Sequence, residues 1–172
     1  GFSNAGAAHA VTEAVLATGR RRIGYIGQVG RGHIERLRDR YAGFRDALAA
    51  ADAGFDEARF AEVPFTFAGG ADALAALLAA APDLEAVVCS SDILAIGALF
   101  ECQRRGVAVP QGLAIAGIDD NDLSPQCVPR LSTVRVPRYR IGRVAGEMIC
   151  RRLAGEGACG PRCSGAHHVA PG

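Results

Sequence analysis

The sequence lacks several features that would assign it to a common functional class. It contains no lysine, because all 19 basic residues are arginine, so the phosphate-binding loop that depends on a lysine is excluded. No apolar stretch is long and uncharged enough to span a bilayer. The net charge of +1 predicts neither a nucleic-acid surface nor an acidic tail. The first ten residues have no basic region followed by an apolar one, so we expect no signal peptide.

Enzyme motifs are also scarce. Starting from Gly30 and Gly32, the third glycine of a dinucleotide-binding fingerprint would fall at Glu35. His33 has the H-x-E spacing of zinc deaminases, but the P-C-x-x-C partner is missing. The G-x-S-x-G elbow of hydrolases is absent. We therefore predict a protein that is not an enzyme and uses no cofactor.

The cysteines favour a reducing compartment. Four of the six lie in or beside apolar segments without paired spacing, as reduced, buried thiols of a cytosolic protein do. These four are Cys89, Cys102, Cys127 and Cys150. A metal site near the C-terminus is an alternative use of the remaining two, but the C-x₃-C-x₃-H-H spacing is not a common zinc pattern. That group consists of Cys159, Cys163, His167 and His168, and we predict no metal there.

What the chain does contain is an alternation of short apolar runs and amphipathic segments. Strands are predicted at residues 23–27, 60–65, 86–89, 113–117 and 131–136, and helices at 5–18, 34–51, 71–81, 93–105 and 139–153. This order predicts an α/β fold, with a parallel sheet flanked by helices on both faces. The segment 157–172 has no periodicity and is expected to be irregular.

Polar side chains follow two successive buried strands. Two serines and an aspartate end the first, and the acidic cluster 119–122 ends the second. Open α/β sheets bind ligands at the carboxyl ends of their strands. The acidic cluster could be a solvated turn or a cation site, or Asp119 could accept hydrogen bonds from ligand hydroxyls. We favour the last interpretation for Asp119.

An arginine near the start of the second predicted helix is a candidate partner for that carboxylate. Arg36 and Arg40 fall on one helical face, and a solvated basic stripe is the simpler interpretation for Arg36. Arg40 follows a glycine-rich loop, from which its guanidinium can reach the crevice and donate to hydroxyls or a carboxylate.

Four motifs occur in a fixed order: R-x-x-G-F at residues 40–44, C-S-S-D-I-L-A-I-G-A-L at 89–99, G-x-D-D at 117–120 and P-x-L-S-T-V at 129–134. Together they resemble the effector-binding core of the lactose-repressor (LacI/GalR) family of bacterial transcriptional regulators. The resemblance covers about residues 1–155, and the run V-R-V-P-R-Y-R-I-G at 134–142 is closest to the gluconate-repressor branch.

The resemblance implies a two-lobed fold like that of periplasmic sugar-binding proteins. Residues 1–134 would form the effector-binding C-terminal lobe, 135–156 the crossing segment and a helix of an incomplete N-terminal lobe, and 157–172 an irregular tail. Family members carry a helix-turn-helix and most of the first lobe upstream. We therefore expect an N-terminally truncated regulator that would reach operator DNA only through the missing N-terminal domain.

The resemblance also implies a set of ligand-binding residues. Arg40 matches the arginine that contacts hydroxyl or acid groups of the effector, and Asp119 matches the aspartate that binds its hydroxyls. Ser91 stands where the family usually has asparagine, so a water could replace its direct contact. Phe65, rather than the phenylalanine two positions later, matches the aromatic lining the pocket, with core packing as an equal alternative. Arg138 could pair with a ligand carboxylate, or it could be a surface arginine.

These implications predict the ligand-sensing domain of a cytoplasmic repressor that responds to a sugar or a sugar acid such as gluconate. The intact protein is expected to be a homodimer without membrane contact. The main alternative is a periplasmic-type sugar-binding protein of a transport system, which has the same fold. An α/β enzyme would need a catalytic motif that the sequence lacks.

Overall fold

The computed structural model describes residues 2–29, 35–155 and 169–170. The helices are α1 (Asn4–Leu16), α2 (Glu35–Ala50), α3 (Phe67–Ala80), α4 (Asp92–Arg105) and α5 (Arg138–Leu153). The strands are β1 (Ile23–Gly27), β2 (Phe60–Glu62), β3 (Ala86–Cys89), β4 (Ala114–Asp119), β5 (Ser132–Arg135) and β6 (Val169–Ala170). Two 3-10 turns are η1 (Glu57–Arg59) and η2 (Ser124–Gln126). The predicted alternation of strands and helices is confirmed.

The strands form one sheet in the order β2-β1-β3-β4-β5-β6. The first five strands are parallel, and only β6 runs antiparallel to its neighbour. One register line crosses the central strands, since Tyr25 pairs with Val88, Val88 with Ala116, and Ala116 with Ser132. The predicted parallel sheet is therefore confirmed, and its carboxyl ends lie along one edge.

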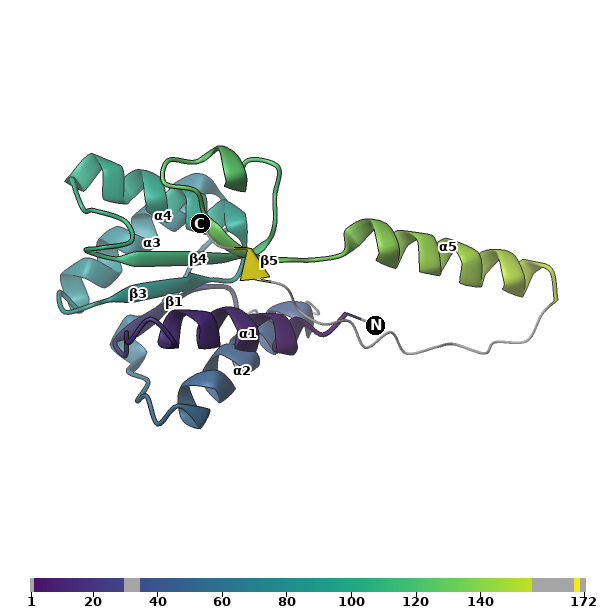
Figure 1. Ribbon diagram of the computed structural model, residues 1–172, viewed down its shortest axis with the longest axis horizontal. Helices are drawn as coiled ribbons and strands as arrows, with labels where there is room; N and C mark the ends of the chain where they lie inside the picture. The colour runs from purple at the N-terminus through teal and green to yellow at the C-terminus, as the bar shows by residue number, and fades with distance from the viewer. Residues whose placement is uncertain (1, 30–34, 156–168, 171–172) are drawn as a thin grey trace.

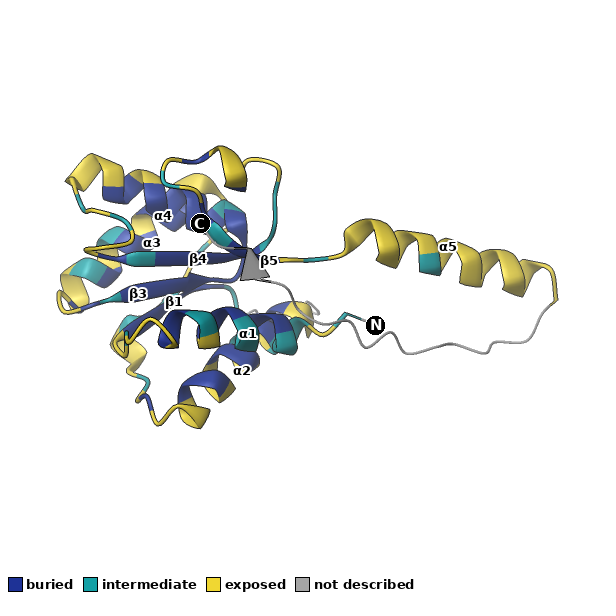
Figure 2. Cartoon of the chain, in the orientation of Figure 1, coloured by how far each residue is buried: buried dark blue, intermediate teal, exposed yellow. Residues whose placement is uncertain are grey.

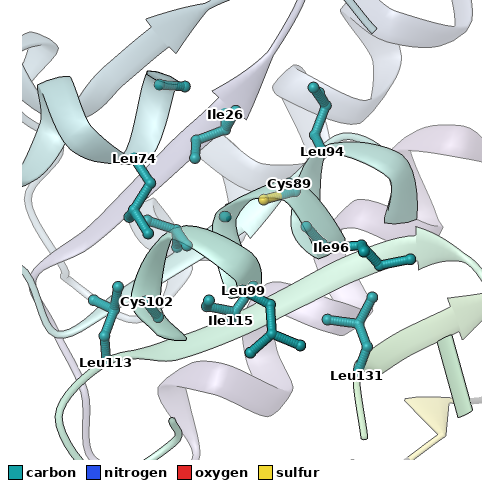
Figure 3. Packing of buried hydrophobic residues seen from close by; sticks show 14 of the residues in the cluster. Ile26, Leu74, Cys89, Leu94, Ile96, Leu99, Cys102, Leu113, Ile115 and Leu131 are labelled. Carbon is teal, nitrogen blue, oxygen red and sulfur yellow. The ribbon is translucent and has the colours of Figure 1, made fainter. Parts of the chain in front are cut away.

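Helices cover both faces of this sheet. Figure 1 shows α3 and α4 on one face and α1 and α2 on the other. Between them β1 and β3 are wholly buried and β4 is buried except at its two ends, as Figure 2 shows. On the α3–α4 side, Leu74, Leu94 and Leu99 are at most 1% exposed and pack as in Figure 3. Burial of each such side chain contributes roughly 2 kcal/mol, so these contacts hold the layers together.

Helices α3 and α4 touch backbone to backbone. A Cβ atom at Gly97 would overlap the carbonyl oxygen of Phe67, and one at Gly70 would overlap that of Leu94. This contact explains why α3 begins earlier than the predicted residue 71. Thr66 caps the helix by accepting a hydrogen bond from the Gly69 amide at 2.9 Å, and packing against α4 compensates for the weak helix propensity of two glycines.

Two strand ends differ from the predicted ones. β2 stops at Glu62 instead of continuing to Phe65, because Pro64 has no N–H with which to extend the ladder. β4 runs two residues beyond the predicted end at Gly117, and Asp119 pairs with Arg135 of β5. Asp119 is therefore the last residue of the strand and does not lie beyond it.

Helix α5 stands apart from the sheet in Figure 1, and none of its residues is buried. Cys150 on this helix is exposed, so the prediction of a buried thiol is wrong at that position because α5 packs against no layer. Cys89, Cys102 and Cys127 are buried free thiols, as predicted. In the described ranges, none of the helices combines the length and apolarity needed to cross a bilayer.

The end of the chain contains a short strand. Val169 pairs with Val134 and Ala170 with Thr133, so β6 covers the edge of β5. The prediction that 157–172 is irregular is wrong for these two residues, and the rest of that segment lies outside the described residues. Without β6, β5 would present an open row of backbone groups at the edge of the sheet, and the backbone of these two residues pairs with part of it. The predicted division of the chain into lobes stays a prediction.

Candidate functional site

The candidate site lies at the edge where β1, β3 and β4 end. Helix α2 begins on this side of the sheet and brings Arg40 against the strand ends, where it is 5% exposed. Asp119 comes from the last position of β4, and Ser90 and Ser91 follow β3 directly. The parallel arrangement thus gathers polar groups from three separate segments at one place.

Arg40 is held by three partners from different parts of the chain. Its Nε donates to Oδ1 of Asn4 at 3.1 Å, and Nη1 donates to the carbonyl oxygen of Ser90 at 2.5 Å. Nη2 donates to Oδ1 of Asp119 at 3.0 Å and forms an ion pair with it. These contacts fix the plane of the guanidinium, which a binding site requires for directional hydrogen bonds.

Asp119 is strained and partly open to solvent. Its φ is +143° and that of Asp120 is +55°, both in the range that favours glycine. The Asp119 side chain is 26% exposed, against 6% for Arg40, so the carboxylate forms the accessible part of the pair. Burial raises the pKa of Asp119 above its usual 3.8, and the neighbouring Arg40 opposes this shift. Strain of this kind costs about 1–3 kcal/mol and persists only where the surroundings impose it.

Ser91 is the N-cap residue of α4, but its hydroxyl makes no capping bond. The side-chain oxygens of Ser90 and Ser91 are buried and have no hydrogen-bond partner among the residues that the structure describes. A buried polar atom without a partner costs about 1–3 kcal/mol. Both hydroxyls belong to the segment whose Ser90 carbonyl accepts from Arg40, and each has the capacity to bond to a water or a ligand hydroxyl.

Arg138 lies beside the same edge. This first residue of α5 donates through Nη2 to the carbonyl oxygen of Asp120 at 3.3 Å. Its neighbour Arg135 forms an ion pair with the Asp120 carboxylate at 2.5 Å. The structure therefore brings Arg138 next to the Arg40–Asp119 pair, although its side chain is exposed.

Phe65 has a different environment. It lies in the loop between β2 and α3 and packs, partly buried, against the core cluster on the α3–α4 side. This contact matches the core-packing alternative for Phe65. The loop leaves the carboxyl end of β2, as the bond from the Val63 amide to the Gly27 carbonyl at 3.2 Å shows. No described contact joins Phe65 to Arg40 or Asp119.

The sequence analysis did not identify the residues that hold the site residues and the adjoining loop in place. Asp92, fully buried, accepts hydrogen bonds from the Asn121 amide at 2.8 Å, Ser124 Oγ at 2.5 Å and Thr133 Oγ1 at 2.6 Å. Asn4, which contacts Arg40, was also missed. An aspartate at the first position of a helix indicates only capping, because its partners lie far away in the sequence.

The arrangement offers donors and acceptors rather than a nucleophile with its base. Within the described ranges, no group of three His, Cys, Asp or Glu residues could hold a metal. The predicted absence of a metal at residues 159–168, and the interpretation of His33, lie outside the described residues. A planar guanidinium, a carboxylate and hydroxyls are the groups that recognise polyols.

Comparison with known proteins places this geometry in a family. The family described as a periplasmic binding protein-like domain matches residues 12–164, which is most of the chain. The chain belongs to this family, on its LacI branch. The resemblance found in the motifs is thereby confirmed.

The similar proteins are transcriptional regulators. The chain is 36% identical over 91% of its length to the HTH-type transcriptional regulator GntR of Escherichia coli K12, and 41% identical to that of Pseudomonas aeruginosa. It covers 46% of the E. coli protein and 45% of the other, so the chain spans about half the length of these relatives. Both relatives are named as transcriptional regulators, and neither name supports the periplasmic-transport or the enzyme alternative.

Solved structures agree on the fold. The transcription regulator GntR from Chromobacterium violaceum matches with a TM-score of 0.91 and 38% identity, over 99% of this chain and 62% of that one. A complex of the transcriptional regulator CelR with cellobiose matches with a TM-score of 0.90 and 29% identity, over 99% of this chain and 51% of that one. The fold is therefore that of periplasmic-binding-protein-like regulators.

Proposed function

We propose that this chain is the effector-binding part of a LacI-type transcriptional repressor that responds to a sugar or sugar acid. The observation that carries the proposal is the Arg40–Asp119 pair, 3.0 Å apart at the carboxyl edge of the parallel sheet. Its relatives, named as regulators, support the regulatory role. The solved CelR–cellobiose complex supports a saccharide as the ligand.

Each proposed ligand-binding residue has a chemical role. Asp119 accepts from effector hydroxyls through the oxygen that Arg40 does not bind, and Arg40 holds that carboxylate while donating to the same hydroxyls. Ser91 supplies a buried hydroxyl that a ligand or water would satisfy. Phe65 contributes through packing of the loop that it occupies, and Arg138 supplies charge at the rim.

The charges at the rim bear on the class of effector. Asp119 neutralises Arg40, and Asp120 pairs with Arg135. Arg138 contacts only the Asp120 carbonyl among the described hydrogen bonds, so it brings a positive charge that favours a sugar acid such as gluconate. An Arg138→Ala variant that weakens binding of gluconate more than of a neutral sugar would support this assignment.

The regulatory mechanism follows from linkage. An effector that binds one arrangement of two lobes more tightly shifts the population toward it, by no more than its differential affinity. In a full-length regulator this shift would move DNA-binding domains on an operator. We place such a protein in the cytoplasm, where its operator is.

The test is calorimetric titration of the full-length protein with gluconate and with cellobiose. We expect binding by the wild type, and an affinity loss of about tenfold or more in Asp119→Asn, because a neutral amide replaces the charged carboxylate and one of its two acceptor oxygens becomes a donor. Asp122→Asn, three residues after Asp119 and exposed, is the matched control. Equal affinity in wild type and Asp119→Asn would refute the site.

We also propose that the protein forms a homodimer through the α3–α4 side. Phe67 and Phe100 are 45% and 40% exposed with ring centroids 6.4 Å apart, and Val128 nearby is 79% exposed. Gln103 on α4 donates to the Val128 carbonyl at 2.7 Å, which joins the loop to the helix. Exposed apolar groups gathered in this way mark contact surfaces.

Sedimentation of the full-length protein tests this surface. Phe100→Arg is expected to yield monomers, because a charge replaces an apolar contact. Arg45→Ala, on α2 at the opposite face of the sheet, should leave a dimer intact. A dimer that persists in Phe100→Arg would place the interface elsewhere.

A further inference from the structure

The backbone around Asp119 needs an external constraint. Asp119 and Asp120 both have positive φ, and neither is a glycine. Residues of this kind keep their conformation only where neighbouring groups hold it. The Arg40 contact constrains the Asp119 side chain, but it leaves the following peptide groups to be held by something else.

A buried relay holds those peptide groups. The Asp120 amide donates to Thr133 Oγ1 at 3.2 Å, and the same hydroxyl donates to Oδ1 of Asp92 at 2.6 Å. Oδ2 of Asp92 receives the Asn121 amide at 2.8 Å and Ser124 Oγ at 2.5 Å. Both oxygens of one carboxylate therefore hold the loop that begins at Asp119.

The space for this relay is provided by Gly117. A Cβ atom at this position would overlap Oδ1 of Asp92, the oxygen that binds Thr133. The fully buried carboxylate of Asp92 can occupy this position only because Gly117 on β4 has no side chain. The Asp92 carboxylate, the space at Gly117 and the hydrogen bonds of Thr133 therefore all serve to hold the loop after β4.

We propose that Asp92 and Thr133 are positioning residues of the effector crevice. They hold the loop after the strained residues Asp119 and Asp120, so that the Asp119 carboxylate is presented to the ligand. This inference rests on the proposed function. Neither residue need touch the effector, because both are buried behind the loop. They act through the hydrogen bonds to Asp120 and Asn121.

Thr133 allows a test with closely matched variants. Thr133→Val removes the hydroxyl but keeps the shape and β-branching, and Thr133→Ser restores the hydroxyl. Thr12→Val is the control for a general loss of stability. Thr12 is equally buried, and its hydroxyl donates to the Ala8 carbonyl of its own helix at 2.7 Å.

Two measurements on the full-length protein distinguish positioning from mere stability. Amide hydrogen exchange of Asp120 and Asn121, followed by NMR, reports the loop without any ligand. Calorimetry with gluconate and cellobiose reports the crevice. In Thr133→Val we expect faster exchange at both amides and about tenfold weaker binding, the size of one lost hydrogen bond near a charge. Thr133→Ser should restore both, and Thr12→Val should change neither.

The outcomes distinguish failure of the positioning role from failure of the proposed effector-binding function. Unchanged exchange at both amides in Thr133→Val would overturn the relay, whether or not a sugar binds. Faster exchange with unchanged affinity, while Asp119→Asn weakens binding, would overturn the positioning role alone. If the wild type binds neither sugar, the proposed function fails, and the positioning role fails with it.

Discussion

Among single residues of the candidate site, Arg40 carries a buried charge, and its free-energy cost must be offset by hydrogen-bond partners. A charge taken out of water is stable only when its partners replace the lost hydration. Arg40 obtains this from an amide oxygen, a carbonyl oxygen and a carboxylate. Removal of the charge therefore leaves three acceptors without their donor.

We predict that Arg40→Met lowers the free energy of unfolding by about 2–4 kcal/mol. This lies near the range for breaking a buried ion pair, reduced because the Asp119 side chain is 26% exposed. Arg45→Met, whose ion pair with Glu57 is exposed and 3.5 Å long, should change stability by less than about 1 kcal/mol. Urea denaturation of both variants checks this, and similar losses would contradict it.

Some single residues of the site could be predicted from the sequence, and others could not. Arg40 and Asp119 could be predicted because each stands at a position where parallel sheets bind ligands. Thr133 could not, since its contact with Asp92 joins residues 41 positions apart. Nor could the positive φ of Asp119, because nothing in a run of aspartates indicates which of them is strained.

At the scale of elements, Glu85 joins the starts of β1 and β3. Its Oε2 accepts from the amides of Arg21 and Arg22 at 2.8 and 2.9 Å, and its Oε1 pairs with the Arg22 guanidinium at 2.5 Å. These amide bonds, that of Arg22 first, lower the pKa of Glu85 below its usual 4.5. The carboxylate thus acts as a clamp between two parallel strands.

The sign of the pH dependence follows from this lowered pKa. A folded-state pKa below the unfolded value contributes stability above pH 4.5, and that contribution is lost as the pH falls through the folded pKa. We therefore predict that Glu85→Gln is less stable than the wild type at pH 7, and that the difference shrinks at pH 3. Denaturation curves at both values measure it. A difference that grew on acidification would contradict the assignment.

Element boundaries were predictable only where the chain itself sets them. The end of β1 and the bounds of β3 match the pattern of apolar residues. The start of α3 does not, because the glycine pair at its beginning looks unfavourable until its contact with α4 is known. Tertiary packing overrides local propensity there.

The molecule as a whole divides into a packed sheet and a solitary helix. Val88 and Leu94 are completely buried, whereas Leu153 on α5 is 84% exposed. In the 172-residue chain we predict that α5 amides exchange at rates set by local opening, and that β3 amides exchange only through global unfolding. Native-state hydrogen exchange measures both. Equal protection would mean that α5 packs against another molecule.

The fold class was predictable at this scale, but the arrangement within it was not. Alternating apolar strands and amphipathic helices indicate a parallel sheet with two covered faces. The order β2-β1-β3-β4-β5-β6 depends on contacts between distant segments. The strand β6 was missed because two residues are too few to show any periodicity.

The pairing of β6 with β5 has a mechanical consequence. The chain leaves the sheet after Arg135 and returns at Val169, and these two strands are antiparallel neighbours, so both connections emerge from the same end. Any tension applied to α5 is therefore passed to β5 as a pull along its axis. The load then falls on the ladder between β5 and β4 in shear, directly beside Asp119, so the sheet would carry movement of the helix into the crevice.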